Sequence, residues 1–399
     1  MMTIGAVRGG DDELTNEDGS TIEDNFWGGD DNDDMTNDGN VGDNMGGGSG
    51  EDEMTNTGDV GGNMTGGTED DTMTNEGDVG GNMGGNDGAD TMTNTGDVTG
   101  GINGGTGDDT MTNAGDAGSM WGGTGDDDMT NEGTVDGNIS GGDDNDTITN
   151  TGDADNMWGG TGDDTMTNEG DIAGNMGGGT GDDTMTNEGD IAGNMGGGTG
   201  DDDLTVAGAV GGNVNGGADD DTVRLADGAA VGGQINGGGG NDTLEFAFSV
   251  SPDEFAALSN IINSSNPTGG TLSFGGNTYT WLNFEQLLNL LTLLQIDGGD
   301  SGGLNDGRLN PHDLAATAAV YCAFTGGIDI YVPPGTGAIQ ANLDQLFTAL
   351  ETATATQTNT LVAEGLGASL WALTSGELQA MGHDGYVFIF DPLRCFEIE

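Results

Sequence analysis

Aspartate residues recur at a nearly constant interval through the first three-fifths of the chain. Each lies two positions before a large apolar residue, and successive members are 18 to 21 residues apart. In most copies the Asp follows Gly-Gly-x-Gly-x, so the local pattern reads G-G-x-G-x-D-x-U-x, where U is apolar. The thirteen members are Asp12, Asp33, Asp52, Asp71, Asp90, Asp109, Asp127, Asp146, Asp164, Asp183, Asp202, Asp221 and Asp242.

These residue types suit a hard cation. Glycines permit a tight turn whose carbonyl groups all point inward, and each Asp adds a carboxylate. Calcium takes six to eight oxygen ligands of these two kinds. The pattern therefore predicts Ca²⁺ as the cofactor, with the thirteen Asp residues as ligands and an ion in each gap between successive copies.

The repeats resemble the haemolysin-type calcium-binding repeat of the RTX family, and the resemblance covers about three-fifths of the chain. It implies a parallel β-roll in which calcium lies between the Gly-Asp turns of successive coils. The repeats are also similar to the nineteen-residue calcium repeats of an ice-binding adhesin domain, which carry a GTG-Asn/Asp-Asp turn. The other half of each repeat, N-x-G-D-[IVA]-x-G-N-M, is not a nonapeptide of this kind, so we expect one column of ions.

Several copies depart from the family pattern, and we expect their turns to bind calcium more weakly. The fourth-position Gly is replaced by Asp31, Glu69, Asp144 and Asp219, and the second Gly is replaced by Arg8 and Asn86.

A fixed period of this length predicts a solenoid in which each repeat forms one coil. In the coil 159–177, T-M-T at 165–167 reads as one strand, and Ile172, Gly174 and Met176 are expected to face one side of a second strand. Fifteen of the 18 Met residues hold the two repeating apolar positions, which indicates a stacked core more than a copper site.

Two further columns are expected from the same period. An Asn column predicts a stacked amide ladder: Asn16, Asn37, Asn56, Asn75, Asn94, Asn113, Asn131, Asn150, Asn168 and Asn187. A second acidic column is interpreted as a solvated edge, with weaker ion binding as the alternative: Asp59, Asp78, Asp97, Asp116, Asp153, Asp171 and Asp190.

Composition restricts the partners. The chain has 71 acidic residues, four Arg, no Lys and a net charge of −67, so it repels nucleic acid and anionic membrane surfaces. The strict period of the apolar positions argues against disorder. No window approaches twenty apolar residues, so no membrane span is expected. The N-terminal segment lacks the apolar run of a secretory signal peptide, which leaves export by an unrecognised signal or a truncated start.

The predicted fold is mainly β: a parallel β-roll or β-solenoid of about 13 coils, an α+β cap, and a small mostly-β C-terminal domain. The predicted domains are 1–246 (calcium-binding roll), 247–296 (cap), 297–313 (Gly/Asp-rich linker) and 314–399 (C-terminal domain). In the cap we expect a helix after the Ser251 capping box, through about Asn263. A hairpin around Gly275-Gly276 and a second helix from Asn283 through LLNLLTLL should follow.

The linker and the C-terminal domain carry weaker signals. GDSGG around Ser301 is the string of a serine-protease nucleophile, but both His residues lie downstream of it, so we reject that reading. The segment 306–313 matches only the second half of an EF-hand-like loop, and a full site is not expected. The last 86 residues resemble an uncharacterised module of secreted bacterial proteins, which implies export, and a Cys322–Cys395 disulfide is the first expectation.

No nucleophile–base pair, zinc-binding helix or phosphate loop is found, so the chain is not expected to be an enzyme. The leading hypothesis is an extracellular or cell-surface, calcium-binding structural protein of matrix, adhesin or surface-layer type. Cell-surface or matrix components are its candidate partners, and the N-terminal coil 9–27, with Phe26 and Trp27, is expected to be exposed and to self-associate.

Two alternatives stay open. One is the C-terminal part of an exported enzyme truncated upstream. The other is a calcium-dependent binding module for ice or another ligand, on a turn-face Thr column that is present in six copies: Thr68, Thr106, Thr124, Thr161, Thr180 and Thr199.

Overall fold

The computed structural model describes residues 9–250, 252–293, 329–331, 387–389 and 397–398. They fall into two compact units: residues 1–223, 228–242 and 273–284 form the first, and residues 224–227, 243–272 and 285–399 form the second. The linker with Ser301, the EF-hand-like loop, both Cys residues, Arg8 and the helix expected near 338–353 lie outside the described residues.

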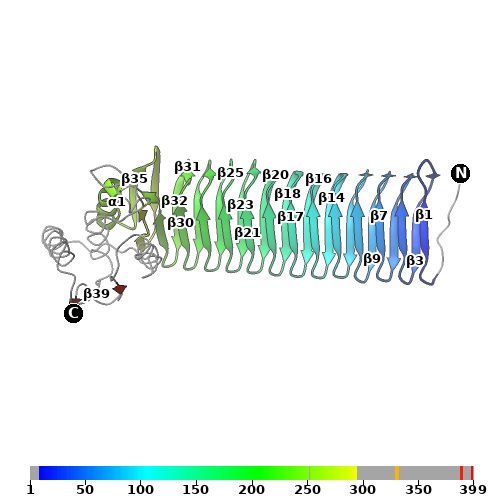
Figure 1. The fold of residues 1–399 in the computed structure, drawn as a ribbon, viewed down its shortest axis with the longest axis horizontal. Coiled ribbons are helices and arrows are strands. Elements are labelled where there is room, and N and C mark those ends of the chain that lie inside the picture. The colour runs from blue at the N-terminus through cyan, green and yellow to red at the C-terminus, as the bar shows by residue number, and fades with distance from the viewer. Residues whose placement is uncertain (1–8, 251, 294–328, 332–386, 390–396, 399) are drawn as a thin grey trace. The chain divides into compact units, whose positions relative to one another are not determined.

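The first unit is a parallel β-solenoid whose coils stack in one row (Figure 1). Each coil contributes one strand of the T-M-T-N type to a first sheet, and equivalent residues pair in register, such as Met166 with Met185. The strands are β1 (Glu13–Asn16), β4 (Asp34–Asn37), β7 (Glu53–Asn56), β10 (Thr72–Asn75), β13 (Thr91–Asn94), β15 (Thr110–Asn113), β17 (Asp128–Asn131), β19 (Thr147–Asn150), β21 (Thr165–Asn168), β24 (Thr184–Asn187), β27 (Asp203–Val206) and β30 (Thr222–Ala226).

The predicted solenoid is thereby confirmed, with about 12 turns. The first strand of the thirteenth repeat, β33 (Thr243–Ala247), belongs to the second unit.

The other half of each coil forms a second sheet. In four central coils it is one strand of 9 or 10 residues: β14 (Asp97–Thr106), β16 (Asp116–Thr124), β18 (Thr134–Asp143) and β20 (Asp153–Thr161). In most others it is a pair: β2 (Thr21–Ile22) and β3 (Phe26–Asp30), β5 (Asn40–Val41) and β6 (Met45–Ser49), β8 (Asp59–Val60) and β9 (Met64–Thr68), β11 (Asp78–Val79) and β12 (Met83–Asp87), β22 (Asp171–Ile172) and β23 (Met176–Thr180), β25 (Asp190–Ile191) and β26 (Met195–Thr199), β28 (Ala209–Val210) and β29 (Val214–Ala218), β31 (Ala230–Val231) and β32 (Gln234–Gly239).

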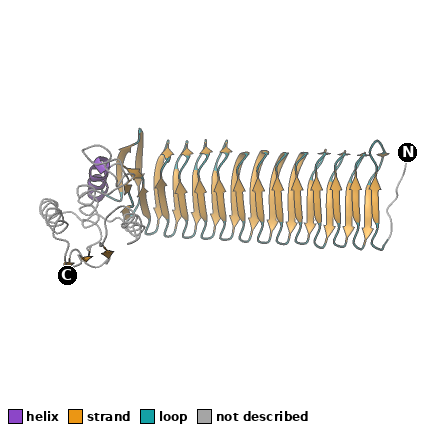
Figure 2. Cartoon of the chain, viewed as in Figure 1, coloured by secondary structure: helices purple, strands orange, loops and turns teal. Residues whose placement is uncertain are grey.

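The single second strand expected in coil 159–177 is therefore wrong for that coil. Residues 173–175 form a bend between β22 and β23, so Gly174 does not continue a strand face. Figure 2 shows this alternation of strands and short turns along the stack. Even the continuous strands shift register at this place, as β14 does between Val98 and Gly101, which is the behaviour of a β-bulge.

The interior of the solenoid is filled by three apolar columns. In the coil 159–177 their members are Met166, Ile172 and Met176, and each is at most 1% exposed. The predicted stacked Met core is confirmed. At the N-terminal coil the expectation of an exposed Phe26 is wrong: Phe26 pairs with Met45, takes the place of a core Met and is fully buried, while Trp27 is half-buried.

The predicted Asn ladder is also confirmed. Each Asn from Asn16 to Asn168 donates its side-chain N–H to the amide oxygen of the next Asn, over 2.6 to 2.8 Å. All ten are buried, and their mutual bonds satisfy amide groups that would otherwise be costly to bury. The ladder ends at Asn187, because Val206 takes the next place.

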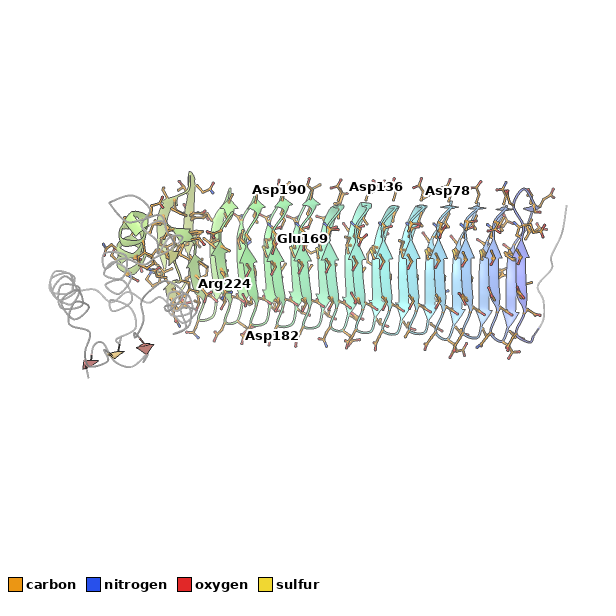
Figure 3. The ribbon with its side chains drawn as sticks, in the orientation of Figure 1. Asp78, Asp136, Glu169, Asp182, Asp190 and Arg224 are labelled. Carbon is orange, nitrogen blue, oxygen red and sulfur yellow. The ribbon has the colours of Figure 1, made fainter. Side chains whose placement is uncertain are left out.

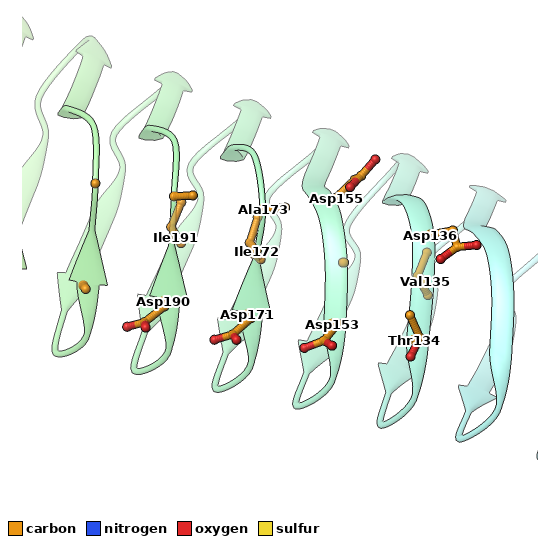
Figure 4. Close-up of a pocket in the computed structure, with 14 residues that line it drawn as sticks. Thr134, Val135, Asp136, Asp153, Asp155, Asp171, Ile172, Ala173, Asp190 and Ile191 are labelled. Atoms are coloured by element: carbon orange, nitrogen blue, oxygen red, sulfur yellow. The ribbon is translucent and has the colours of Figure 1, made fainter.

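The second acidic column lies on the outside of the second sheet, and all seven residues are exposed. Asp153, Asp171 and Asp190 stand in register along a shallow hollow of about 600 Å³ (Figure 4). The interpretation of this column as a solvated edge agrees with its exposure.

Residues 273–284 continue the second sheet of the first unit. The strand β36 (Asn277–Leu282) pairs in parallel with β32, placing the buried Trp281 opposite Ile235. The Tyr279 hydroxyl donates to the carbonyl of Ala229 over 2.8 Å. The segments on either side of Gly275-Gly276 are strands, as predicted: β35 (Gly269–Phe274) and β36, and the two glycines have positive φ values of 60° and 88°.

The second unit contains the predicted helix, α1 (Pro252–Ser264). The second predicted helix, from Asn283 through LLNLLTLL, is wrong. Its residues form β37 (Gln286–Asn289) and β38 (Thr292–Leu293), which pair in parallel with β33 and with β34 (Ser249–Val250). The apolar run supplies a strand that covers a sheet edge, with Leu287 opposite Leu244.

Three short strands are described near the C-terminus: β39 (Asp329–Tyr331), β40 (Val387–Ile389) and β41 (Glu397–Ile398). β39 and β40 lie within two of the predicted strand runs, IDIYV and YVFIF, and pair antiparallel. Among all the described residues, no helix has the length and apolar character needed to cross a membrane.

Candidate metal sites

The structure places the predicted Asp ligands in one line inside the first unit. Each lies at the end of a Gly-rich turn, directly before the first residue of a first-sheet strand, as Asp164 lies directly before β21. The twelve from Asp33 to Asp242 are at most 3% exposed, whereas Asp12 in the first coil is half-buried. The constant repeat length brings them together, because it returns each Asp to the same place in its coil.

One oxygen of each of the twelve carboxylates is held by the backbone. The Oδ1 atom accepts the backbone N–H of the equivalent Asp in the preceding coil, over 2.7 to 3.0 Å. Asp164, for example, accepts from Asp146 and donates its own N–H to Asp183. These bonds fix the direction in which the other oxygen of each carboxylate points.

That other oxygen, Oδ2, is buried and has no hydrogen-bond partner in eleven coils. The eleven residues are Asp33, Asp52, Asp71, Asp90, Asp109, Asp127, Asp146, Asp164, Asp183, Asp202 and Asp221. A buried carboxylate oxygen without a partner is costly, so native proteins normally give it a hydrogen bond or a cation. The same unpaired oxygen in eleven coils indicates that one kind of ligand would serve all of them.

The surroundings of Oδ2 suit a cation. A Cβ atom built on Gly159 would collide with Asp164 Oδ2 and would lie 2.7 Å from the carbonyl oxygen of Gly178 in the next coil. A carboxylate oxygen and a carbonyl oxygen therefore face the same point, and the missing side chain keeps that point open. Gly85 and Gly104 show the same arrangement. Oxygen atoms of these two kinds are the ligands that calcium prefers, so the residues fit the ion that the repeats imply.

Each place beside an Oδ2 atom has one buried carboxylate. Within the described part of the chain, no three acidic, His or Cys side chains converge as a metal-binding group. The other ligands of a bound cation would therefore be backbone carbonyls and water. This donor set suits calcium better than zinc, which takes Cys and His in closed sites.

The turns keep a positive φ even where the sequence departs from the pattern. Gly162, at the fourth position, has a φ of 125°, and the replacements Asp31, Glu69, Asp144 and Asp219 have φ values of 73° to 78°. Asn86, at the second position, has a φ of 84°. Asn and Asp tolerate this left-handed region better than most residues. The departures therefore preserve the turn, and weaker calcium binding in these copies stays a prediction.

Burial changes the acid–base behaviour of the column. It raises the pKa of Asp71, Asp109, Asp146, Asp164, Asp202 and Asp221 to about 7, and that of Asp52, Asp127 and Asp183 to about 6. Removal from water is the main cause. The backbone N–H bond to Oδ1 opposes the rise, and neighbouring carboxylates add to it. Without a cation the column resists ionisation near neutral pH.

Two repeated polar columns were not predicted from the sequence. In seven copies the residue before the ligand Asp is an Asp that accepts a backbone N–H of the next coil, as Asp163 does from Asp182 over 2.8 Å. A second column of Asn residues does the same on the second sheet, as Asn175 does from Asn194 over 2.9 Å. Figure 3 shows Asp182 at the turn edge, opposite Asp78 and Asp190. The signal for both columns was their recurrence at a fixed place in the repeat.

No protein-family model matches the chain, and no curated protein matches it. The chain is similar to a solved X-ray structure of a hyperactive, Ca²⁺-dependent, β-helical antifreeze protein from an Antarctic bacterium. The two share 26% sequence identity with a TM-score of 0.55, over 65% of this chain and 87% of the other. The similarity agrees with the β-solenoid, and the resemblance to the RTX family stays a prediction.

Proposed function

We propose that the chain is a calcium-dependent β-solenoid protein that works outside the cell as a structural or surface component. The observation that carries this proposal is the column of buried Oδ2 atoms without a hydrogen-bond partner, repeated in register in eleven coils. The Ca²⁺ dependence printed for the similar antifreeze protein supports it independently.

The residues of the chain have separate roles in this proposal. The Asp from Asp12 to Asp242 would supply the carboxylate ligands, and the first Gly of each Gly-Gly pair would supply a carbonyl from the neighbouring coil. A calcium ion supplies two positive charges between coils that otherwise repel each other. The backbone N–H bonds to Oδ1 orient the carboxylates before an ion arrives, so little reorganisation is needed on binding.

The composition favours a place outside the cell. Millimolar calcium is an extracellular condition, and sites with one carboxylate and several carbonyls are suited to that concentration more than to cytosolic calcium. A net charge of −67 also keeps such a protein soluble once the inner carboxylates are neutralised. We retain the prediction that the chain is not an enzyme.

Equilibrium dialysis against calcium, with metal analysis of the retained protein, tests this function. We expect about twelve ions per chain, one per gap in the Asp column, and no comparable uptake of magnesium, which demands a tighter octahedral shell. Uptake of two or fewer calcium ions at millimolar calcium would contradict the proposal.

A second candidate function is ice binding, and it rests on the similarity to the antifreeze protein and on the turn-face Thr column. Thr161, Thr180 and Thr199 are exposed and in register. The column is interrupted by Asp87 and Asp143, which accept hydrogen bonds from Thr106 and Thr161 over 3.3 and 3.2 Å. Since charge and occupied hydroxyls both oppose an ice-like water layer, we rank this function second. A thermal-hysteresis measurement in calcium decides it.

A further inference from the structure

The outer face of the second sheet carries two exposed Trp residues that the calcium sites do not use. Only three large apolar side chains are exposed in the described part of the chain: Trp121 at 48%, Trp158 at 38% and Ile261 at 45%. Both Trp residues directly follow a core residue, Met120 or Met157, and so point outward from the sheet. An exposed Trp is unfavourable in water, and its large flat ring commonly serves recognition.

The two Trp residues belong to one column of the sheet. Trp121 pairs with Ser140, and Ser140 pairs with Trp158. They are therefore two coils apart, about 9.6 Å at the usual strand spacing, with a small side chain between them. This distance is close to the repeat of an extended β-linked disaccharide.

The same column continues into a hollow without side chains. Trp158 pairs with Gly177, and the six-membered part of its ring lies over the place where a Gly177 side chain would stand. Gly196 follows in the next coil. Beyond the ring is a shallow hollow of about 430 Å³, lined by Trp158, Gly177, Gly196, Asn194 and Asn215 among others. From Trp121 to Gly196 the column extends over four coil spacings, about 19 Å.

Amide groups border this hollow. Asn175 and Asn194 line it, and their positions are held by the Asn column: the backbone N–H of Asn175 donates to Asn156 over 2.8 Å, and that of Asn194 donates to Asn175 over 2.9 Å. These bonds use the amide oxygens of Asn156 and Asn175, and the Asn194 NH₂ group also donates to the Asn175 oxygen over 3.2 Å. The Asn175 NH₂ group and the second N–H of Asn194 are the donors that this rim offers to hydroxyl groups.

We propose that Trp121, Trp158 and the adjoining hollow bind an uncharged, extended β-linked polysaccharide of the cellulose or chitin type. The apolar faces of alternate sugar rings would stack on the two indole rings, and the chain would continue over Gly177 and Gly196. The rim amides would donate to ring hydroxyls. This partner fits the flat, open shape of the surface, which has no deep pocket for a small molecule.

Charge determines the class of polysaccharide. The chain carries 71 acidic residues against four Arg, so polyuronates, sulfated glycans, nucleic acids and anionic membranes are all repelled. A neutral chain avoids this repulsion. The hollow borders Gly197 and Gly216, which lie beside Asp202 and Asp221 of the calcium column. The test is therefore made in excess calcium, so that a failure to bind polysaccharide leaves the calcium proposal untouched.

The test is retention of the full chain on insoluble cellulose and on insoluble chitin in millimolar calcium, with polyuronate beads as the anionic comparison. We expect retention on at least one neutral polymer and none on the polyuronate. Trp158→Ala and the double variant with Trp121→Ala should reduce retention at least tenfold. Trp27→Ala is the matched control, because Trp27 has the same place in the repeat but no second Trp two coils away.

Circular dichroism in calcium shows whether each variant keeps the β signal. A second readout needs no variant: soluble β-linked hexasaccharides should change the Trp fluorescence of the wild type. The proposal is overturned if the wild type binds neither polymer, or if the double variant is retained as well as the wild type. It is also overturned if the variants lose a self-association that sedimentation detects and nothing else, since the surface would then bind a second copy of the chain.

Discussion

Replacing Asp164 by Asn should have opposite effects on the fold with and without calcium. Burial raises the pKa of Asp164 from 3.8 to about 7. A difference of about 3 pH units corresponds to about 4 kcal/mol, because each unit is about 1.4 kcal/mol. Above pH 7 this is the approximate cost of ionising Asp164 in the calcium-free fold, and Asn does not bear it. Its amide oxygen can still accept from Asp146, and its NH₂ faces the open point near the Gly178 carbonyl.

In calcium the same substitution removes a ligand. We expect Asp164→Asn to lower the number of bound ions by at least one and to raise the calcium concentration at which the β signal appears. Asp171→Asn, on the exposed acidic column of the same coil, is the matched control and should change neither quantity appreciably.

The assay has two arms, both followed by circular dichroism at pH 8. In chelator, added sodium sulfate favours the compact state, and Asp164→Asn should need less sulfate than the wild type to show the β signal. In the calcium titration it should need more calcium. If the variant is destabilised in both arms, Asp164 has a purely structural role. If it behaves as Asp171→Asn does in both, it is not a ligand.

Three further predictions follow from the same geometry. In chelator the stability of the solenoid should fall as pH rises from about 4 to about 7, because carboxyls whose folded pKa is raised bind more protons when folded. The sulfate concentration needed to produce the β signal at pH 5 and at pH 8 checks this, and a lower requirement at pH 8 would contradict it. Gly159→Ala should abolish calcium binding at its gap, because the new Cβ would collide with Asp164 Oδ2. Gly84→Ala should be tolerated, because the nearest contact of its new Cβ would be the carbonyl oxygen of Asn103 at 3.6 Å. The number of calcium ions bound by each variant distinguishes the two. The first coil should exchange its amide hydrogens faster than coil 159–177, because β1 is paired on one side only within the described sheet. For the same reason it should associate with other copies of the chain as concentration rises. Equal protection of both coils in a dilute monomer would refute the prediction.

Much of the solenoid could be predicted because one constraint acts on every coil. A fixed repeat length returns Met166, Asn168 and Asp164 to the same places as Met185, Asn187 and Asp183, whatever the local strand propensity. The line of Asp residues and the amide ladder both follow from that. The half-buried Asp12 is the exception, because its coil stands at the end of the Asp column.

The errors arose where the repeat stops or where backbone detail decides. The run LLNLLTLL is apolar in nearly every position, so its pattern does not distinguish a helix from a buried strand. Here β37 is the partner of β33, a requirement set by tertiary structure and not by the segment itself. The bend at 173–175 and the Trp158 ring over Gly177 likewise depend on contacts between coils that a single repeat does not reveal.

The central claim is that the Asp column makes folding of the solenoid depend on calcium. Circular dichroism of the full chain at pH 8 and low salt, first in chelator and then in millimolar calcium, tests it most directly. The account predicts little β signal in chelator and a full β signal in calcium, reversed when chelator is added again. A full β signal in chelator that calcium does not change would contradict it.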